Sequence, residues 1–412
     1  MRIVSGPEAS EMIERVAARG QQVGPSDSQA QRIVREVRQN GDSALRRFAE
    51  QWDGLSPQEP IKISKHELAA AQRRLTAPLR ASIRESAENI RRFCELQKPR
   101  SFTRSRAGLT LGQIVKPLES VGCYIPGGRY PLLSTVLMTV IPAQVAGVKQ
   151  IRVVSPNPSR EVLAVAAMLG VREFYRIGGA QAIAALAYGT ESIPRVQKIV
   201  GPGNAYVTTA KRLVAFDCAI DFLAGPTEAV ILSERGKPQF IASDLIAQAE
   251  HDVDALAFLI TTSRVLAHAV VEILERLVQG NPTAKASLQK GAVFLASSKA
   301  QAREWANRVA PEHITVDEEY APFIQNAGSI FVGDYSAQAA GDYASGPNHV
   351  LPTAGQARFR GGLSVLDFVK IISVQKLSRR GLRSIAPAIE CLATAEGLLG
   401  HADSIRVRRA DA

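Results

Sequence analysis

The sequence contains little of what marks a secreted or membrane-bound protein. Only four of its 412 residues are cysteines, and no two of them form a C-x-x-C pair. This argues against a disulfide framework or a thiolate zinc site and favours reduced thiols in the core. The first residues include no apolar run typical of a secretory signal. The most apolar stretch, residues 130–148, holds two prolines and several hydroxyl residues, which is typical of a buried core. We therefore expect a cytoplasmic protein that does not bind a membrane.

The chain has an excess of positive charge. Its 50 Lys and Arg residues outnumber 39 Asp and Glu residues and give a net charge of +11. Such an excess can indicate a nucleic-acid partner. Here the basic residues are spread along amphipathic segments such as residues 73–92, where Glu85 and Glu88 separate the arginines. No aromatic-rich platform or zinc-finger spacing accompanies them. We interpret them as solvated helix faces and expect no nucleic-acid partner. A non-catalytic nucleic-acid-binding protein is the remote alternative.

The arrangement of apolar residues predicts an α/β protein. Hydrophobic residues make up 46% of the chain, and its length suits two or three domains. Residues 7–100 show helical spacing of apolar residues and include a long Arg-rich helix over residues 66–97. Short β-rich runs then alternate with helical runs, first over residues 151–214 and again over residues 229–332. This alternation predicts two lobes, each with a parallel sheet covered by helices.

The sequence lacks the G-x-G-x-x-G fingerprint of a standard dinucleotide-binding fold. The nearest run is Gly201-Pro-Gly-Asn-Ala-Tyr, in which Tyr206 takes the place of the third glycine. Its glycines lie between a predicted strand and a predicted helix, where the backbone can approach an anion. The pairs Gly178-Gly179 and Gly127-Gly128 have similar surroundings. Each could be only a tight turn, but three within about 80 residues favour a nucleotide or phosphate cleft.

Among the six histidines, His251 ends a predicted helix. Gln248 and Asp244 precede it on the same helix face. A Gln-x-x-His pair can present a carbonyl oxygen and an imidazole nitrogen to a metal. The alternative is a helix end at which the histidine interacts favourably with the helix dipole.

Glu312 and His313 follow Pro311 and enter an apolar run. This places an acid and a base at the mouth of a strand, an edge of the kind at which ligands bind in open α/β sheets. Because adjacent strand residues point to opposite faces, both can reach one site only if the backbone turns there. A surface loop is the alternative.

The last polar residues of interest lie toward the end of the chain. Asp342 and His349 belong to a loop rich in turn formers, and His401 follows Glu396-Gly-Leu-Leu-Gly. A metal held by Gln, His, Asp and His would have mixed oxygen and nitrogen ligands, which suits zinc or a similar divalent ion. The spacing is too wide for a zinc-finger module, so the fold would have to bring these residues together.

These residues lie in blocks through which the chain resembles histidinol dehydrogenase over nearly its whole length. The blocks come in the order of that family and comprise GCYIPGG (122–128), STVLM (134–138), GGAQA (178–182), GPGNAY (201–206), AGPTE (224–228), QAEHD (248–252), PEH (311–313), GDYASGPNHVLPT (341–353) and EGLLGH (396–401). The family oxidises L-histidinol to L-histidine through an aldehyde in two NAD-dependent steps, as the last reaction of histidine biosynthesis.

The resemblance implies a role for each candidate residue. One zinc ion per subunit is held by Gln248, His251, Asp342 and His401, the last donated by the partner subunit of an intertwined homodimer. Glu312 and His313 match the catalytic pair, and the positions that contact NAD are Tyr124, Gln181 and Asn204. The substrate is held by His313 and the zinc ligands together with Thr227, His349 and Glu396. Thr227 stands where many members have serine, so a hydroxyl is kept.

The pattern and the resemblance together give the expected architecture. It consists of two incomplete Rossmann-like lobes with parallel sheets, a helical N-terminal region and a C-terminal dimerisation arm. The N-terminal region covers residues 1–121 and leads into the second lobe. The NAD-contacting lobe covers residues 122–233, and the lobe with the zinc and catalytic residues covers residues 234–365. The arm, residues 366–412, is expected to be mostly helical and to end in a short β-like run at residues 404–408.

The chemistry fits these assignments. The unperturbed pKa of a histidine lies near neutrality, so His313 suits a base that takes the alcohol proton. Glu312 is expected to help water attack the aldehyde. The alternative within the enzyme class is a related zinc- and NAD-dependent dehydrogenase of another polar alcohol, such as a sulfonated diol. A carboxylate at Glu396 favours a cationic substrate over an anionic one.

Overall fold

The structure is a computed structural model that describes residues 1–20, 26–127 and 130–411. It has two compact units, which are Met1–Gln97 with Glu119–Phe368 and Lys98–Leu118 with Val369–Ala412. The first unit contains two parallel sheets with their helices, and the second contains an antiparallel sheet and two helices. The α/β class and the parallel sheets predicted from the sequence are confirmed.

The first sheet has five parallel strands in the order β6-β5-β4-β7-β8. All five residues of the central strand β4 are buried, as expected for a strand covered on both faces. The chain moves from β4 to β5 on one side and later returns to β7 on the other, so a binding crevice is expected where β4 and β7 end. The strands are β4 (Ser120–Tyr124), β5 (Gln150–Val154), β6 (Glu173–Tyr175), β7 (Lys198–Val200) and β8 (Ala219–Ile220).

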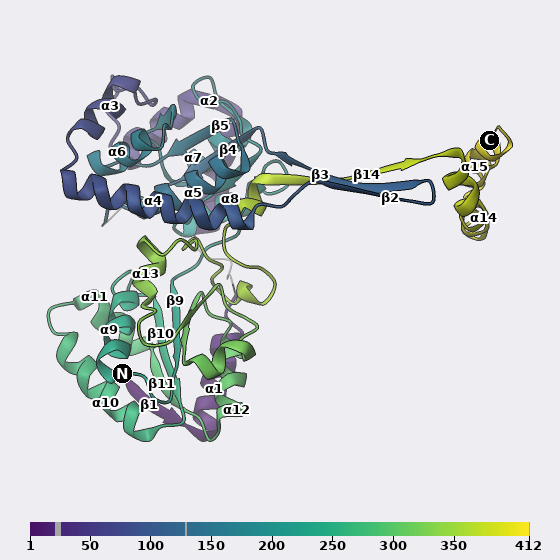
Figure 1. The fold of residues 1–412 in the computed structure, drawn as a ribbon. Coiled ribbons are helices and arrows are strands. Elements are labelled where there is room, and N and C mark those ends of the chain that lie inside the picture. The colour runs from purple at the N-terminus through teal and green to yellow at the C-terminus, as the bar shows by residue number, and fades with distance from the viewer. Residues whose placement is uncertain (21–25, 128–129, 412) are drawn as a thin grey trace. The chain divides into compact units, whose positions relative to one another are not determined.

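Helices cover this sheet (Figure 1). Ile33 of α2, Ile183 of α7 and Val207 of α8 belong to one buried cluster with the strands. The crossover helices α5 and α6 join β4 to β5 and β5 to β6, and right-handed crossovers place them together on the opposite face. The helices are α2 (Ser26–Trp52), α3 (Lys65–Arg73), α4 (Ala77–Gln97), α5 (Leu133–Ala146), α6 (Arg160–Met168), α7 (Gly179–Tyr188) and α8 (Ala205–Val214).

The second sheet has six parallel strands in the order β1-β11-β10-β9-β12-β13. The first residues of the chain form its edge strand β1, so the N-terminus is part of this sheet. β9, which starts at Glu228, belongs to this sheet rather than to the first. The strands are β1 (Arg2–Ser5), β9 (Glu228–Leu232), β10 (Leu256–Thr261), β11 (Ala292–Leu295), β12 (His313–Val316) and β13 (Ser329–Val332).

The faces of the second sheet are covered by two different sets of helices, as Figure 1 shows. Ile13 of α1 and Trp305 of α12 belong to one buried cluster, and Leu245 of α9, Leu274 of α10 and Leu288 of α11 belong to another. The segments are α1 (Gly6–Ala17), α9 (Pro238–Ala249), α10 (Arg264–Leu277), α11 (Pro282–Lys290), α12 (Lys299–Val309), α13 (Gln338–Tyr343) and the 3-10 helices η1 (Glu318–Phe323), η2 (Gln356–Arg358) and η3 (Val365–Phe368). No helix of the described residues is both long and apolar enough to cross a bilayer.

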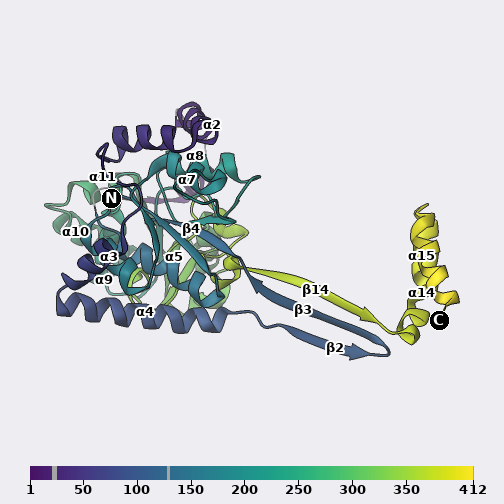
Figure 2. The same cartoon turned by 90° about the horizontal axis from the view of Figure 1, so that it is seen from above.

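The second unit is an antiparallel sheet followed by a helical hairpin. β2 (Phe102–Arg106), β3 (Leu109–Pro117) and β14 (Val369–Leu377) lie side by side in the order β14-β3-β2 (Figure 2). α14 (Arg379–Ala395) follows β14 and packs against α15 (Leu399–Ala410). Apolar side chains are exposed in this unit, including Ile371, Leu392, Leu398 and Val407.

Two expectations about the helices are wrong. Residues 66–97 do not form one helix, because α3 ends at Arg73 and the Thr76 hydroxyl accepts the Leu79 N–H where α4 begins. Residues 404–408 are not β-like but part of α15, where Arg406 pairs with Asp403 one turn earlier and with Glu390 of α14. Contacts with α14 therefore override the alternating pattern of this run.

The expectation of core thiols holds for three of the four cysteines. Cys94, Cys123 and Cys218 are buried, whereas Cys391 is exposed on α14. None of the four forms a disulfide within the chain. Burial raises the pKa of the Cys94 thiol to about 11, and it raises the pKa of the Cys123 and Cys218 thiols to about 12, so these three stay protonated.

Candidate active site

The predicted catalytic pair lies at the start of β12. Glu312 and His313 are 7% and 4% exposed, and His313 Nδ1 lies 3.7 Å from Glu312 Oε2. The cap of α12, Ala310, has a left-handed backbone with a φ of +49°, so the chain turns just before the strand. Because Glu312 precedes the first strand residue, the alternation of side chains along β12 does not separate the pair. Because both side chains are buried, the alternative that Glu312 and His313 belong to a surface loop is excluded.

The position of this pair in the sheet differs from what we expected. Ligands in open α/β sheets bind at the carboxyl ends of the strands. Glu312 and His313 lie instead at the amino end of β12, where His313 is in register with Ala229 near the start of β9. The pair therefore does not use the usual binding edge of its sheet.

Burial governs the protonation of the pair. It raises the pKa of the Glu312 carboxyl to about 7, although the His313 ring opposes this shift. Burial alone would lower the pKa of His313, but the Glu312 and Asp342 carboxylates outweigh it and leave that pKa raised. A carboxyl with a pKa of about 7 can accept or release a proton at neutral pH, and the raised pKa of His313 favours its protonated form.

Asp342 connects the pair to the predicted metal ligands. His313 Nε2 lies 3.3 Å from Asp342 Oδ1, and Gln248 Nε2 donates to Asp342 Oδ2 at 3.2 Å. The Phe331 ring stacks on His313 with 5.9 Å between the centroids. A Cβ atom at Gly341 would lie 2.7 Å from two carbons of the Phe331 ring, so glycine lets α13 bring Asp342 this close.

Gln248 and His251 lie at the end of α9. Gln248 is 1% exposed, and its Oε1 atom has no hydrogen-bond partner among the described residues. His251 is exposed just beyond the helix cap, and its backbone N–H donates to the Gln248 carbonyl at 3.4 Å. Burial would raise the pKa of Asp342, but His313, His349 and His251 together lower it. Three of the four predicted ligands are thus brought together in the first unit.

Gln248, His251 and Asp342 offer the donor atoms of a metal site. Among the described residues, no group of three or more His, Cys, Asp and Glu side chains is placed to hold a metal. Gln248, Asp342 and His251 still offer an amide oxygen, a carboxylate and an imidazole, a mixed donor set that suits zinc. A buried acceptor without a partner costs free energy. The Gln248 Oε1 atom therefore fits the role of a ligand.

Two predicted substrate contacts also lie in the first unit. His349 Nδ1 lies 2.8 Å from the Asp342 carbonyl oxygen, so Nδ1 carries the proton and Nε2 is left as an acceptor. Burial lowers the pKa of His349, which keeps this ring neutral. Asn348 holds the loop in place by donating to the Met138 carbonyl of α5 at 2.7 Å. Thr227 is half-buried just before β9.

Glu396 and His401 are the predicted site residues that belong to the second unit. Glu396 caps the end of α14, and His401 lies in the first turn of α15. Both are exposed in the single chain. Their side chains are therefore free to meet another chain.

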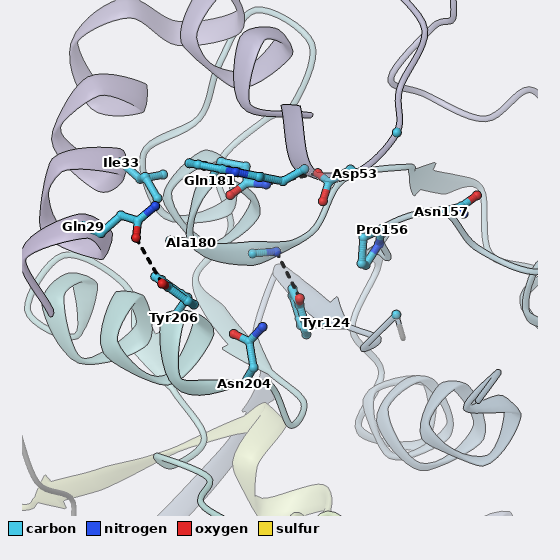
Figure 3. A pocket seen from close by; sticks show the side chains of 14 residues that line it. Gln29, Ile33, Asp53, Tyr124, Pro156, Asn157, Ala180, Gln181, Asn204 and Tyr206 are labelled. Atoms are coloured by element: carbon cyan, nitrogen blue, oxygen red, sulfur yellow. Dashed lines mark hydrogen bonds between the residues drawn. The ribbon is translucent and has the colours of Figure 1, made fainter. Parts of the chain in front are cut away.

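A cavity of about 690 Å³ lies at the carboxyl end of the first sheet (Figure 3). All three predicted NAD-contacting residues line it, with Tyr124 at the end of β4, Gln181 in the first turn of α7 and Asn204 at the N-terminal cap of α8. This is the switch point at which ligands bind in sheets of this type. The volume is in the range of sites for small molecules and cofactors.

The predicted glycine turns form walls of this cavity. Gly179 N donates to the Tyr124 hydroxyl at 3.1 Å (Figure 3). Gly201 has a φ of +115°, and a Cβ atom there would collide with the Tyr124 carbonyl oxygen. Gly127 also lines the cavity, whereas Gly128 lies outside the described residues.

Gln29 and Asp53 are among the cavity residues that sequence reasoning missed. Asp53 Oδ2 accepts hydrogen bonds from Gly178 N at 2.9 Å and from Gln181 Nε2 at 3.1 Å. Gln29 Oε1 accepts one from the Tyr206 hydroxyl at 3.0 Å (Figure 3). Both residues come from the N-terminal helical region. The only sequence feature there that could have pointed to them is the turn-forming pair Asp53-Gly54.

Comparison with known proteins identifies the family. Residues 17–409 match the family model described as histidinol dehydrogenase. Histidinol dehydrogenase of Aquifex aeolicus is 44% identical over 98% of this chain and 97% of its own length, and that of Thermus thermophilus is 44% identical over 97% and 99%. The crystal structure of histidinol dehydrogenase from Elizabethkingia anophelis is similar with a TM-score of 0.95 and 34% identity, over 100% of this chain and 98% of that one. These similarities favour neither the dehydrogenase of another polar alcohol nor the nucleic-acid-binding protein. The chain belongs to the histidinol dehydrogenase family, whose members are NAD-dependent oxidoreductases.

Proposed function

We propose that this chain oxidises L-histidinol to L-histidine through L-histidinal with two NAD⁺, the last step of histidine biosynthesis. The observation that carries the proposal is the buried Glu312–His313 pair joined to Asp342, which can take a proton from an alcohol near neutral pH. An assay of NADH formation with L-histidinol tests it, with two NADH expected for each L-histidine formed. Reduction of NAD⁺ by other polar alcohols but not by L-histidinol would contradict it.

Gln248, His251 and Asp342, together with His401 of a second subunit, are proposed to hold one zinc ion. The mixed donor set and the buried, unpartnered Gln248 Oε1 atom support this assignment. Zinc would act there as a Lewis acid toward the substrate, and NAD⁺ would act as the hydride acceptor. Thr227, His349 and Glu396 are proposed to complete the substrate site. A carboxylate such as Glu396 suits a cationic substrate and disfavours a sulfonated one.

The catalytic pair has two successive tasks in this proposal. His313 accepts the hydroxyl proton at Nδ1, a buried atom with no hydrogen-bond partner in the described residues. Asp342 holds the opposite ring nitrogen and thereby fixes the ring. Glu312 then takes a proton from the water that attacks the aldehyde carbon. A carboxyl with a pKa of about 7 can accept that proton and release it again at neutral pH.

Tyr124, Gln181 and Asn204 are proposed to contact NAD⁺ in the cavity of the first sheet. Tyr124→Phe removes the hydroxyl that accepts the Gly179 N–H and leaves that donor unpaired at the cavity wall. An unpaired buried donor costs about 1–3 kcal/mol, so the KM for NAD⁺ should rise roughly 10-fold. Steady-state kinetics should show an unchanged KM for L-histidinol. Tyr188→Phe is the control, because the Tyr188 hydroxyl binds Asp217 outside the cavity. An equal change in both variants would contradict the assignment.

Residues 366–412 are proposed to be exchanged in a homodimer, so that each site takes His401 from the partner chain. The exposed apolar side chains of the second unit, such as Ile371, Leu392, Leu398 and Val407, support a covering second copy. The exposure of Glu396 and His401 in the single chain is consistent with contacts to another chain.

The shared site predicts complementation between two inactive variants. Co-expression of His313→Asn chains with His401→Ala chains should restore activity, because each heterodimer then has one site with both histidines. Random pairing should give about a quarter of wild-type activity. Each variant expressed alone serves as the control. If heterodimers form but the co-expressed mixture is inactive, His401 belongs to the site of its own chain.

We also propose that the enzyme acts in the cytoplasm. The support is its biosynthetic role and its four free cysteines, since free thiols are typical of reducing compartments.

A further inference from the structure

A second buried carboxylate lies next to Glu312, and the proposed reaction does not use it. Glu228 is the first residue of β9 and is 3% exposed. Its backbone N–H donates to Glu312 Oε2 at 3.1 Å. It is also the last residue of the AGPTE block, and neither the proposed metal site nor the proposed substrate site includes it.

Arg19 binds this carboxylate with both arms of its guanidinium. Arg19 Nε donates to Glu228 Oε1, and Arg19 Nη2 donates to Glu228 Oε2. The Ala354 N–H adds a third hydrogen bond to Glu228 at 2.9 Å. The Arg19 and Glu228 side chains are 15% and 4% exposed. The two residues therefore form a bidentate ion pair that is largely screened from water.

The same guanidinium holds the segment that leads to the catalytic pair. Arg19 Nη1 donates to the Val309 carbonyl at 2.9 Å and to the Val16 carbonyl at 2.5 Å. Val309 ends α12, and only Ala310 and Pro311 separate it from Glu312. One side chain thus joins the end of α1, the start of β9 and the turn that delivers Glu312.

We propose that Arg19 and Glu228 are positioning residues for Glu312, which fix the Val309–Glu312 turn and the N–H donor to the Glu312 carboxylate. The inference rests on the role proposed for Glu312 in the attack of water on the aldehyde. Neither residue is among those proposed to hold the substrate. Loss of their ion pair should let Glu312 move, and small misplacement of a catalytic group is costly in rate.

The test measures the two oxidations separately, the first as the pre-steady-state formation of the first NADH from L-histidinol and the second as turnover with L-histidinal as the substrate. Arg19→Met and Glu228→Gln should lower kcat for L-histidinal about 10- to 100-fold more than for the first oxidation, with KM changed less than about two-fold. Arg19→Lys keeps the charge but not the bidentate geometry and should recover part of the rate. Arg308→Met is the matched control, because Arg308 joins the same two helices through an exposed pair with Glu14 and should leave both rates unchanged.

A double variant distinguishes the effect of these residues on stability from their effect on the position of Glu312. Removing one partner of a buried pair leaves an uncompensated charge, so the single variants lose stability, whereas replacing both by apolar residues can preserve it. Arg19→Met combined with Glu228→Met should therefore fold with a Tm near that of the wild type and still be slow with L-histidinal. Recovery of wild-type rates in this double variant would overturn the inference, and so would equal losses in both oxidations in the single variants.

Glu312→Gln distinguishes this inference from the proposed function. If Glu312→Gln slows the oxidation of L-histidinal selectively but the Arg19 and Glu228 variants do not, only the positioning role is wrong. If Glu312→Gln slows both oxidations alike, the role assigned to Glu312 is wrong, and the inference falls with it.

Discussion

Replacing His313 with asparagine should lower kcat for L-histidinol about 10²- to 10⁴-fold, the usual cost of losing a well-placed general base. An asparagine amide can still donate a hydrogen bond toward Asp342, but it cannot accept a proton at neutral pH. His313 is buried beside the Glu312 and Asp342 carboxylates, which raise its pKa although burial opposes them. The KM for L-histidinol should change far less than kcat, because the metal ligands remain. Steady-state NADH formation measures both constants.

His268→Asn is the matched control for this variant. His268 is exposed on α10, outside the predicted site, so its replacement should leave kcat unchanged. Thermal unfolding should show that His313→Asn retains the folded state. Turnover at the wild-type rate in His313→Asn would remove His313 from the mechanism.

The parallel sheets were predictable because their strands are buried runs that alternate with helices. β4 and β9 are buried at every residue, which is the pattern that sequence reasoning recognises best. The strands of the second unit were missed for the opposite reason. All five residues of β2 are exposed, and β14 has no buried residue, so neither shows the alternation of a strand with one face in a core.

The local parts of the site were also predictable, but their assembly was not. Glu312 and His313 are neighbours in the sequence, and Gln248 and His251 are only three positions apart at the end of α9, so these pairs stood out. Asp342 reaches His313 only because Gly341 lets α13 approach Phe331, a contact between residues that no spacing rule connects.

The N-terminal region contributes side chains whose contacts with distant parts of the chain could not be predicted from the sequence either. Asp53 and Arg19 lie in or beside segments that sequence reasoning interpreted only as amphipathic helices. Asp53 meets the Gly178 N–H across 125 positions of the sequence, and Arg19 meets Glu228 across 209. Such contacts follow from the packing of whole elements, and composition or periodicity does not reveal them.

Removing the metal should abolish the oxidation of L-histidinol, and added zinc should restore it. The residues proposed to bind it include the buried Gln248 Oε1 atom, which no group in the described part of the chain satisfies, and the Asp342 carboxylate beside it. Gln248→Ala should weaken zinc binding by at least about 10- to 100-fold, since even the loss of an outer hydrogen-bond partner of a ligand costs that much. Asp342→Ala should have a larger effect, because it also removes the contact that fixes the His313 ring. Zinc content of the purified variants and activity at increasing zinc concentration measure both effects.

Gln144→Ala is the matched control for Gln248→Ala. Gln144 is a partly buried glutamine of α5, and both ends of its amide are satisfied within the fold, by Arg91 and by the Leu169 carbonyl. Its replacement should lower stability by about 1 kcal/mol and leave the zinc content unchanged. Equal loss of zinc in both variants would mean that general destabilisation, rather than loss of a ligand, releases the metal. Full activity in protein shown to be free of metal would refute the zinc assignment and leave the buried Gln248 oxygen to be explained by an interaction with the substrate itself.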